Sequence, residues 1–213
     1  MSNRGCLILA LLVLASELSA QTVAVEVHVY DQAGLQPPTF QKLVTQTQKI
    51  LAETGLSIQV KPCGRSVSVV CESQTYGTRY LVVRVVAGGP KKMQNVRRPP
   101  LGLSFADADG GKYASVFLER VQDEAASSNI PWITVLAYAT AHEIGHLLLG
   151  NQAHTPRGVM KATWDRIDYE AMNQNYLHFS EEQIRQLRSR YGSAGAAVIS
   201  PEPLRLAVEV EHE

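Results

Sequence analysis

The chain has 213 residues, and its 20 Lys and Arg residues are balanced by 20 Asp and Glu residues. This neutral total argues against a protein that holds nucleic acid or an anionic membrane by bulk charge. Apolar residues make up 45% and charged residues 19% of the chain, close to globular averages, which excludes disorder throughout and collagen-like, coiled-coil and multi-span membrane classes. We therefore expect one globular domain with a substantial buried core.

The first 20 residues have the layout of a secretory signal peptide. A polar start with one positive charge, at Arg4, precedes the apolar run CLILALLVLA at residues 6–15, and small residues then predict cleavage after Ala20. The run is too short for a membrane span, which needs about 20 residues. We expect a secreted or periplasmic protein with no membrane span in its mature form. The alternative interpretation is a buried N-terminal helix or an uncleaved anchor.

Cleavage at this point leaves two cysteines, Cys63 and Cys71. An even number suits an oxidising compartment. We predict a disulfide between them, which would close a short loop and contribute about 2–3 kcal/mol. Two buried thiols are the alternative.

Alternating or continuous apolar runs, bounded by Gly, Pro and polar residues, predict five strands. These strands span residues 23–30, 56–60, 80–86, 101–106 and 113–121. The first alternates strictly, with valine at every odd position, so we expect it to be buried on one face and polar on the other. Between the first two strands, helical spacing predicts a helix capped by Thr39 and ended by Gly55, which is typical of a parallel strand pair covered by a helix.

Two loops are candidates for binding. Residues 87–100 are basic and rich in Gly and Pro, and we interpret them as a solvated surface loop. The acidic turn at residues 107–111 lacks the spaced oxygen ligands of a calcium loop, so we predict a plain hairpin turn.

The run from Trp132 to Leu149 is apolar on nearly every side and predicts a central, buried helix. We expect Ser128 or Asn129 to cap it, Pro131 to occupy its first turn and Gly150 to end it. A later helix is predicted to begin at a capping box and to run to about residue 191. That capping box pairs Ser180 with Gln183.

The central helix contains the sequence HEIGH, with His142 and His146 four residues apart and Glu143 beside the first. Residues four apart on a helix share a face, so both imidazoles can reach one metal ion, as zinc requires of its nitrogen ligands. Glu143 lies about 100° around the helix from His142, where it can flank the metal as a general base. A chance HExxH in about 200 residues has a probability below about 1%. The competing interpretation is a pair of core histidines with satisfied hydrogen bonds.

Residues after this motif supply a candidate third ligand. Gly150 ends the helix, His154 follows, and Met160 lies six residues further on. A straight helix would carry His154 about 12 Å beyond His146 along its axis, so the chain must fold back. A glycine at position 150 allows that turn.

This pattern resembles the metzincin zinc metallopeptidases, whose signature is HExxHxxGxxH followed by a methionine turn. The resemblance implies that His142, His146 and His154 bind Zn²⁺, that Glu143 is the catalytic base, and that Met160 forms an apolar floor beneath the metal.

The resemblance also implies an α+β or α/β fold. We expect a metzincin-like twisted mixed sheet, two long helices (a backing helix and an active-site helix) and a small C-terminal helical subdomain. The expected segments are a signal peptide at 1–20, a single zinc metallopeptidase domain at 21–192 with an upper part at 21–150 and a lower part at 151–192, and a disordered tail at 193–213.

The spacing departs from the family pattern. The family places Gly three and the last His six residues after the second His, whereas Gly150 lies four and His154 eight residues after His146. Acids downstream are alternative third ligands, since gluzincin-type and aspzincin-type enzymes use Glu or Asp there. These acids are Asp165, Asp168 and Glu170. We prefer His154 because Gly150 and Met160 frame it.

The predicted function is a secreted zinc-dependent endopeptidase that cleaves peptide bonds by Glu143-assisted attack of a zinc-bound water. We expect a monomer with a peptide or protein substrate, extended along an edge strand at residues 101–106, and with no nucleic-acid partner. The alternatives are a non-catalytic zinc-binding protein and a zinc hydrolase acting on another amide, such as a cell-wall peptide. We assign no role to His28, His178, His212, Tyr169 and Tyr176.

Overall fold

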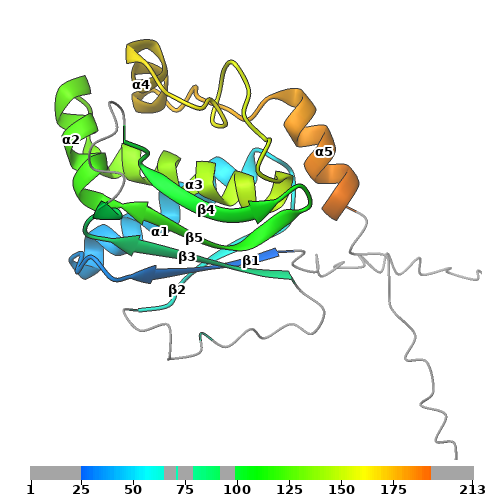
Figure 1. The fold of residues 1–213 in the computed structure, drawn as a ribbon, viewed down its shortest axis with the longest axis horizontal. Coiled ribbons are helices and arrows are strands. Elements are labelled where there is room, and N and C mark those ends of the chain that lie inside the picture. The colour runs from blue at the N-terminus through cyan, green and yellow to red at the C-terminus, as the bar shows by residue number, and fades with distance from the viewer. Residues whose placement is uncertain (1–24, 65–70, 72–78, 92–98, 193–213) are drawn as a thin grey trace, which may run out of the picture.

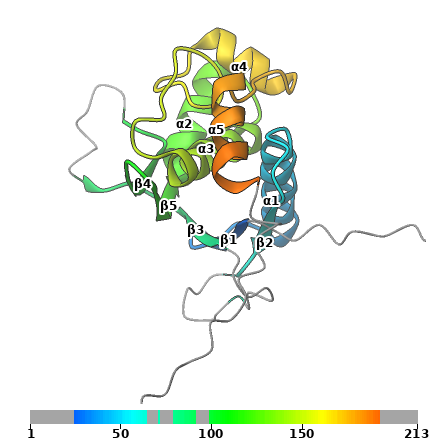
Figure 2. The same cartoon turned by 90° about the vertical axis from the view of Figure 1, so that its right-hand side faces the viewer.

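A mixed sheet of five strands forms one layer of the molecule, and the long helices α1 and α3 form a second layer on one face of it (Figures 1 and 2). The computed structural model describes residues 25–64, 71, 79–91 and 99–192. The strands are β1 (Val25–Asp31), β2 (Ile58–Pro62), β3 (Arg79–Val86), β4 (Gly102–Asp107) and β5 (Gly110–Phe117). The helices are α1 (Pro37–Ala52), α2 (Leu118–Ser128), α3 (Trp132–Leu149), α4 (Arg166–Asn173) and α5 (Glu181–Tyr191). The predicted signal peptide, the predicted tail and the middle of the basic loop lie outside the described residues.

The strand order is β2-β1-β3-β5-β4, with β4 at an edge. The strands β2, β1, β3 and β5 are parallel to one another, and β4 pairs with β5 in an antiparallel hairpin. The parallel pair covered by a helix is therefore confirmed, since β1 and β2 flank α1 in sequence and α1 packs against β2. The plain hairpin turn at residues 107–111 is confirmed as well.

The expected polar face of β1 is wrong, because both of its faces are buried. Val25, Val27 and Val29 are fully buried in the core, as predicted. However, Glu26 and His28 on the opposite face are only 1% and 4% exposed. Side chains from other strands cover them: Lys61 pairs with Glu26, and Tyr80 stacks on His28.

Helix α1 begins earlier than predicted. Pro37 and Pro38 occupy its first turn, and Gln36 is the N-cap residue without a side-chain hydrogen bond, so Thr39 does not cap the helix. Gly55 has the expected left-handed conformation, with φ of 72°.

The segment after β5 differs most from the expectation. The predicted strand to residue 121 stops at Phe117, and helix α2 begins at the next residue. Asn129 adopts φ of 54° and is the C-cap residue of α2, so it does not cap α3. The N-cap residue of α3 is Pro131. The central helix α3 is buried on nearly every side and ends at Gly150, as predicted. The capping box of Ser180 and Gln183 before α5 is also confirmed.

One hydrophobic cluster joins the sheet, α1, α3 and the lower helices, from Val25 to Leu187. In the described part of the chain, no helix is both long and apolar enough to cross a membrane. The predicted disulfide between Cys63 and Cys71 is confirmed, with their Cα atoms 5.4 Å apart.

The turn of the β4–β5 hairpin lies in close contact with the end of α3. A Cβ atom at Gly110 would lie 2.4 Å from the carbonyl oxygen of Leu147, and Gly110 also has φ of +113°. Gly64 has a comparable φ of +75° but no atom within 4 Å of such a Cβ. Alanine at Gly64 should cost about 1–2 kcal/mol of unfolding free energy from its backbone conformation alone. Alanine at Gly110 should cost about 1–3 kcal/mol more, because it also clashes. Urea unfolding of the two variants measures the difference, and equal losses would contradict a close contact of hairpin and helix.

Candidate metal centre

Three imidazoles converge where α3 ends. His142 and His146 lie one helical turn apart on α3, and their Nε2 atoms are 3.2 Å apart. Gly150 then turns the chain, with φ of 100°, and the Nε2 of His154 lies 3.0 Å from the Nε2 of His146. The structure therefore brings together the three histidines that the sequence singled out, with one ring nitrogen of each within 4.8 Å of the others.

Hydrogen bonds fix the tautomers of two of these rings. The Nδ1 atom of His142 lies 2.7 Å from the carbonyl oxygen of Val159, and the Nδ1 atom of His146 lies 3.1 Å from that of Gly150. Because a carbonyl oxygen only accepts, each Nδ1 must carry a proton and donate it. In the neutral rings both Nε2 atoms are then bare, and their lone pairs face each other across 3.2 Å. A cation between them would remove this repulsion.

Protonation of the imidazole rings themselves does not supply that positive charge. Burial lowers the pKa of His142 to about 4, and burial also lowers the pKa values of His146 and His154. The neutral imidazole is the form that binds a metal ion. Nitrogen ligands of a tetrahedral zinc ion, at about 2.0–2.1 Å from it, lie about 3.3 Å apart, close to the spacing found here. The donor set therefore fits zinc.

Glu143 projects from the same helix toward the edge strand. Its side chain is only 6% exposed, and burial raises the pKa of its carboxyl group to about 7, while a hydrogen bond from the Ser104 hydroxyl acts in the opposite direction. A Cβ atom at Gly102 would lie 2.6 Å from Cγ of Glu143. The carboxylate thus fills the space that a glycine leaves in β4. Sequence reasoning missed both Gly102 and Ser104, because nothing local marks them as neighbours of Glu143.

Apolar side chains pack against α3 and against the ring of His142. Met160 is fully buried, and a Cβ atom at Gly145 would lie 2.2 Å from its sulfur atom, so the helix and this methionine are in close contact. The ring of Trp164 packs edge-on against His142, with 5.5 Å between the ring centres, and its indole N–H donates to the carbonyl oxygen of Gly158. Met160 therefore packs against α3, and its role as an apolar floor beneath the metal stays a prediction. Trp164 was not anticipated.

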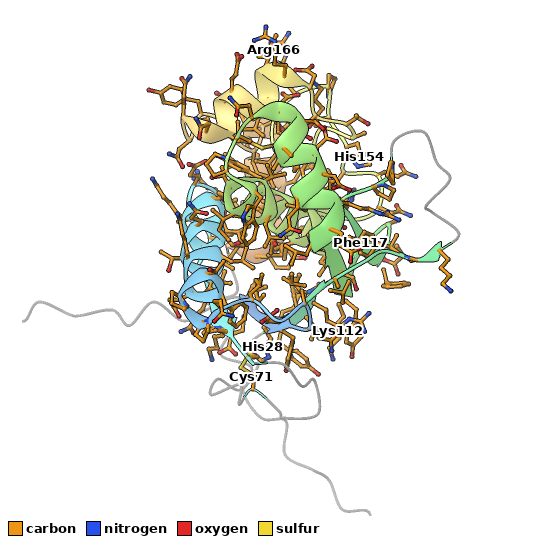
Figure 3. All side chains as sticks on the ribbon, turned by 90° about the vertical axis from the view of Figure 1, so that its left-hand side faces the viewer. His28, Cys71, Lys112, Phe117, His154 and Arg166 are labelled. Atoms are coloured by element: carbon orange, nitrogen blue, oxygen red, sulfur yellow. A yellow bond between two sulfur atoms is a disulfide. The ribbon has the colours of Figure 1, made fainter. Side chains whose placement is uncertain are left out.

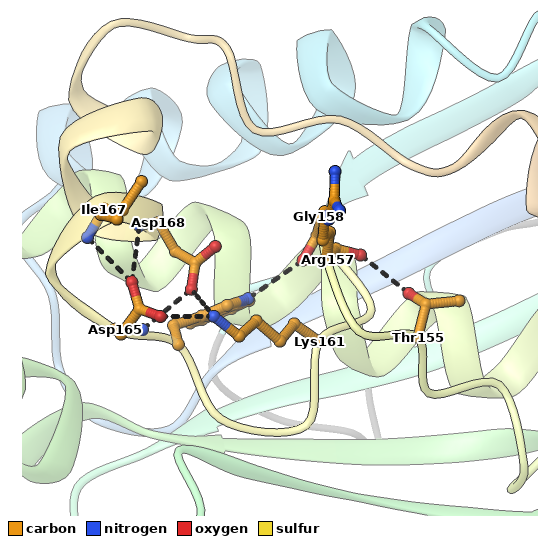
Figure 4. A network of polar contacts seen from close by, with 8 residues as sticks. Thr155, Arg157, Gly158, Lys161, Asp165, Ile167 and Asp168 are labelled. Carbon is orange, nitrogen blue, oxygen red and sulfur yellow. Dashed lines mark hydrogen bonds and ion pairs between the residues drawn. The ribbon is translucent and has the colours of Figure 1, made fainter.

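The acidic residues that competed for the third ligand position are engaged elsewhere (Figure 4). Asp165 is the N-cap of α4, which the sequence did not predict, and shares a capping box with Asp168. The Nζ atom of Lys161 lies 2.7 Å from Asp165 and 2.5 Å from Asp168. Glu170 pairs with Arg166. These contacts leave His154 as the third side chain that joins the pair on α3.

The residues to which the sequence assigned no role are not part of the group formed by His142, His146 and His154. Tyr169 is buried next to Trp164, and Tyr176 is 68% exposed. His178 pairs with Glu53 across 2.6 Å, and His212 lies outside the described residues. His28, on β1, belongs to a separate group with Cys63 and Cys71.

A metal ion at the three histidines should stabilise the folded chain. At a zinc concentration about 100 times the dissociation constant, binding adds about 2.7 kcal/mol, which is about 5–10 °C in melting temperature for a chain of this size. We expect a chelator to lower the melting temperature of the wild type and of Asp165→Ala by this amount. It should have no effect on His154→Ala. His178→Ala, which removes a histidine elsewhere, is the matched control and should respond like the wild type. If His154→Ala keeps its zinc and Asp165→Ala loses it, the three-histidine centre is wrong.

The similarity of this chain to known proteins lies in its fold. No protein-family model and no curated protein matches this chain. Among solved structures, the chain is similar to archaemetzincin from Methanopyrus kandleri, with a TM-score of 0.54 and 13% identity, over 81% of this chain and 98% of archaemetzincin. A Thermotoga maritima protein, known from its solution structure, aligns with a TM-score of 0.33 and 12% identity over 83% of this chain and 99% of that protein. The five-stranded mixed sheet and its helices thus form a metzincin-like α/β fold similar to that of archaemetzincin, as the sequence resemblance implied.

Proposed function

We propose that this chain is a secreted zinc-dependent endopeptidase, in which His142, His146 and His154 hold the metal and Glu143 is the general base. One observation carries the proposal: three imidazoles present their Nε2 atoms to one point, with two of their Nδ1 protons given to backbone carbonyls. A buried carboxylate lies beside them on the same helix. A purely structural zinc site would have no use for that carboxylate and would fill its fourth position with protein.

The chain's own groups account for the movement of protons. Bound zinc would act as a Lewis acid on the substrate carbonyl and on the attacking water. Glu143 takes the proton of that water and later delivers it to the leaving amine nitrogen. The Ser104 hydroxyl and the backbone at Gly102 hold the carboxylate on the side of the helix that faces β4. The apolar surroundings of His142, including Trp164, keep bulk water from competing for the ring nitrogens.

The edge strand supplies a binding surface for the substrate. β4 pairs with β5 on one side and is the last strand of the sheet on the other. An extended peptide can add to such an edge through backbone hydrogen bonds. Since Gly102 of β4 contacts Glu143, a peptide paired with β4 would pass the general base. We therefore propose that residues 101–106 form the edge that the sequence predicted, and that the substrate is a peptide or protein.

The fold and the disulfide support two parts of this proposal. The likeness to archaemetzincin is a likeness to a structure whose name marks it as a metzincin. The Cys63–Cys71 disulfide favours an oxidising compartment, in agreement with the signal peptide that residues 1–20 predict.

Removal of the base should separate binding from turnover. Glu143→Gln should reduce the turnover of a protein substrate at least about 10²–10⁴-fold, because the water loses its proton acceptor. Its zinc content should equal that of the wild type. Glu170→Gln, which alters a glutamate paired with Arg166 on α4, is the matched control and should keep full activity. Full turnover by Glu143→Gln would contradict this mechanism. A wild type that binds zinc but cleaves no protein, peptide or cell-wall peptide would instead support the non-catalytic alternative.

The glycine in the edge strand should matter through Glu143. Gly102→Ala should lower kcat about 10²-fold at unchanged zinc content, because its Cβ atom would displace the carboxylate by about 1 Å. The matched control is Gly88→Ala, whose Cβ atom would come within 2.9 Å of the carboxylate of Glu119 on α2, away from the histidines. We expect this control to keep the wild-type kcat. Equal kcat values for both variants and the wild type would mean that Glu143 is not held by β4.

A further inference from the structure

A second group of side chains of the kinds that bind metal ions lies on the other side of the sheet. His28 and Cys71 project from the face that none of the described helices covers, whereas His154 lies on the helical side (Figure 3). One ring nitrogen of His28 and the sulfur atoms of Cys63 and Cys71 all lie within 4.8 Å of one another. The group is therefore separate from the three histidines at the end of α3.

The ring of His28 is held as a metal ligand would be. It is only 4% exposed, and its Nε2 atom lies 3.1 Å from one carboxylate oxygen of Glu26, a side chain that is itself 1% exposed. The other oxygen of Glu26 lies 2.9 Å from the Nζ atom of Lys61. A carboxylate bonded to one imidazole nitrogen fixes the tautomer and orientation of the ring and makes the other nitrogen a better ligand.

Backbone hydrogen bonds, in addition to the disulfide, hold Cys63 beside β1. The N–H of Cys63 donates to the carbonyl oxygen of Val29 at 2.8 Å, and the N–H of Asp31 donates to the carbonyl oxygen of Gly64 at 2.8 Å. The Cα atoms of Cys63 and Cys71 are 5.4 Å apart. Two thiolates of a tetrahedral zinc site, at about 2.3 Å from the ion, lie about 3.8 Å apart, which side-chain rotation at this Cα separation permits.

We propose that His28, Cys63 and Cys71 form a second metal site, for a borderline-soft divalent cation such as zinc, when the disulfide is reduced. A dithiol reductant breaks the S–S bond by supplying two electrons and two protons, so that two thiols form and the reductant becomes a disulfide. The cation then displaces the two thiol protons into solvent. In the reduced chain, the metal ion replaces the disulfide bond as the link between Cys63 and Cys71.

Charge favours this exchange. In the oxidised chain, the carboxylate of Glu26 is balanced by the ammonium group of Lys61. Two thiolates would add two negative charges beside the buried carboxylate, and a divalent cation cancels them. Thiolate sulfur and imidazole nitrogen are the ligands that zinc prefers, whereas calcium and magnesium prefer oxygen.

Cobalt(II) is a suitable probe because a thiolate bound to it gives a charge-transfer absorption that imidazole ligands do not. The experiment uses the whole chain with Cys6→Ser, so that Cys63 and Cys71 are the remaining cysteines. After reduction and anaerobic removal of the reductant, Co²⁺ should produce a thiolate band that saturates with one ion at this site. The oxidised chain should show none. His154→Ala should leave the band unchanged, which separates this site from the proposed catalytic centre.

Two variants test the assigned ligands. Cys71→Ser should lose most of the band, and His28→Gln should weaken Co²⁺ binding at least about 10-fold, the smallest effect expected even of an outer-shell change. Retained zinc at the three histidines of each variant verifies its fold. No thiolate band in the reduced parent chain would overturn the proposal. The same would follow from a His28→Gln chain that binds Co²⁺ as tightly as its parent, since the thiols would then bind without the imidazole.

Discussion

Two backbone carbonyl groups decide what the histidines of α3 can bind. Val159 and Gly150 accept the Nδ1 protons of His142 and His146, and each acceptor lies in the segment after the helix. Without them, either ring nitrogen of each imidazole could carry the proton, and the helix alone would present a mixture of donors and acceptors. With them, both Nε2 atoms are bare and face one point. The helix and the following segment together therefore create a donor set that fits zinc.

The lower part of the chain is organised to keep that segment in place. Gln183 of α5 donates from its side-chain amide to the carbonyl oxygen of Ala153 at 2.9 Å, while its side-chain oxygen accepts from the N–H of Ser180. The N–H of Thr155 donates to the carbonyl oxygen of Met160 at 2.9 Å and closes the turn around residues 156–159. One capping box therefore begins a helix and also anchors the residues on either side of His154.

Features set by contacts close in sequence could be predicted. The four-residue spacing of His142 and His146, the glycine that ends α3 and the capping box at Ser180 each follow from local geometry, and the structure contains all three. The boundary between β5 and α2 was predicted too late in the chain, because Leu118 and Val121 are apolar like the residues of β5. In the structure they belong to α2, which packs against α3.

Features set by side-chain pairings that the sequence pattern does not mark also escaped prediction. Glu26 and His28 were expected to face solvent, but Lys61 and Tyr80, which are far from them in sequence, bury them. Asp165 and Asp168 looked like possible metal ligands until the structure showed them bound to Lys161 at the start of a helix. A carboxylate in a sequence does not reveal whether a lysine has already neutralised it.

The segment between α3 and His154, where the spacing departs from the metzincin pattern, contacts the β4–β5 hairpin. On leaving α3, Gly150 passes so close to the hairpin that a Cβ atom there would lie 2.4 Å from the carbonyl oxygen of Ala108. The N–H of Asn151 then donates to the carbonyl oxygen of Asp107 at 2.8 Å. The chain makes both contacts before His154 returns to the histidine pair on α3.

This route ties the third histidine to the edge strand. The hairpin that holds Asn151 is continuous with β4, and β4 also carries the glycine against which Glu143 rests. A displacement of β4 would therefore move Glu143, the proposed general base, and the return path to His154 at the same time. The segment between His146 and His154 thus connects the β4–β5 hairpin, and through it the proposed substrate edge, to the proposed third ligand.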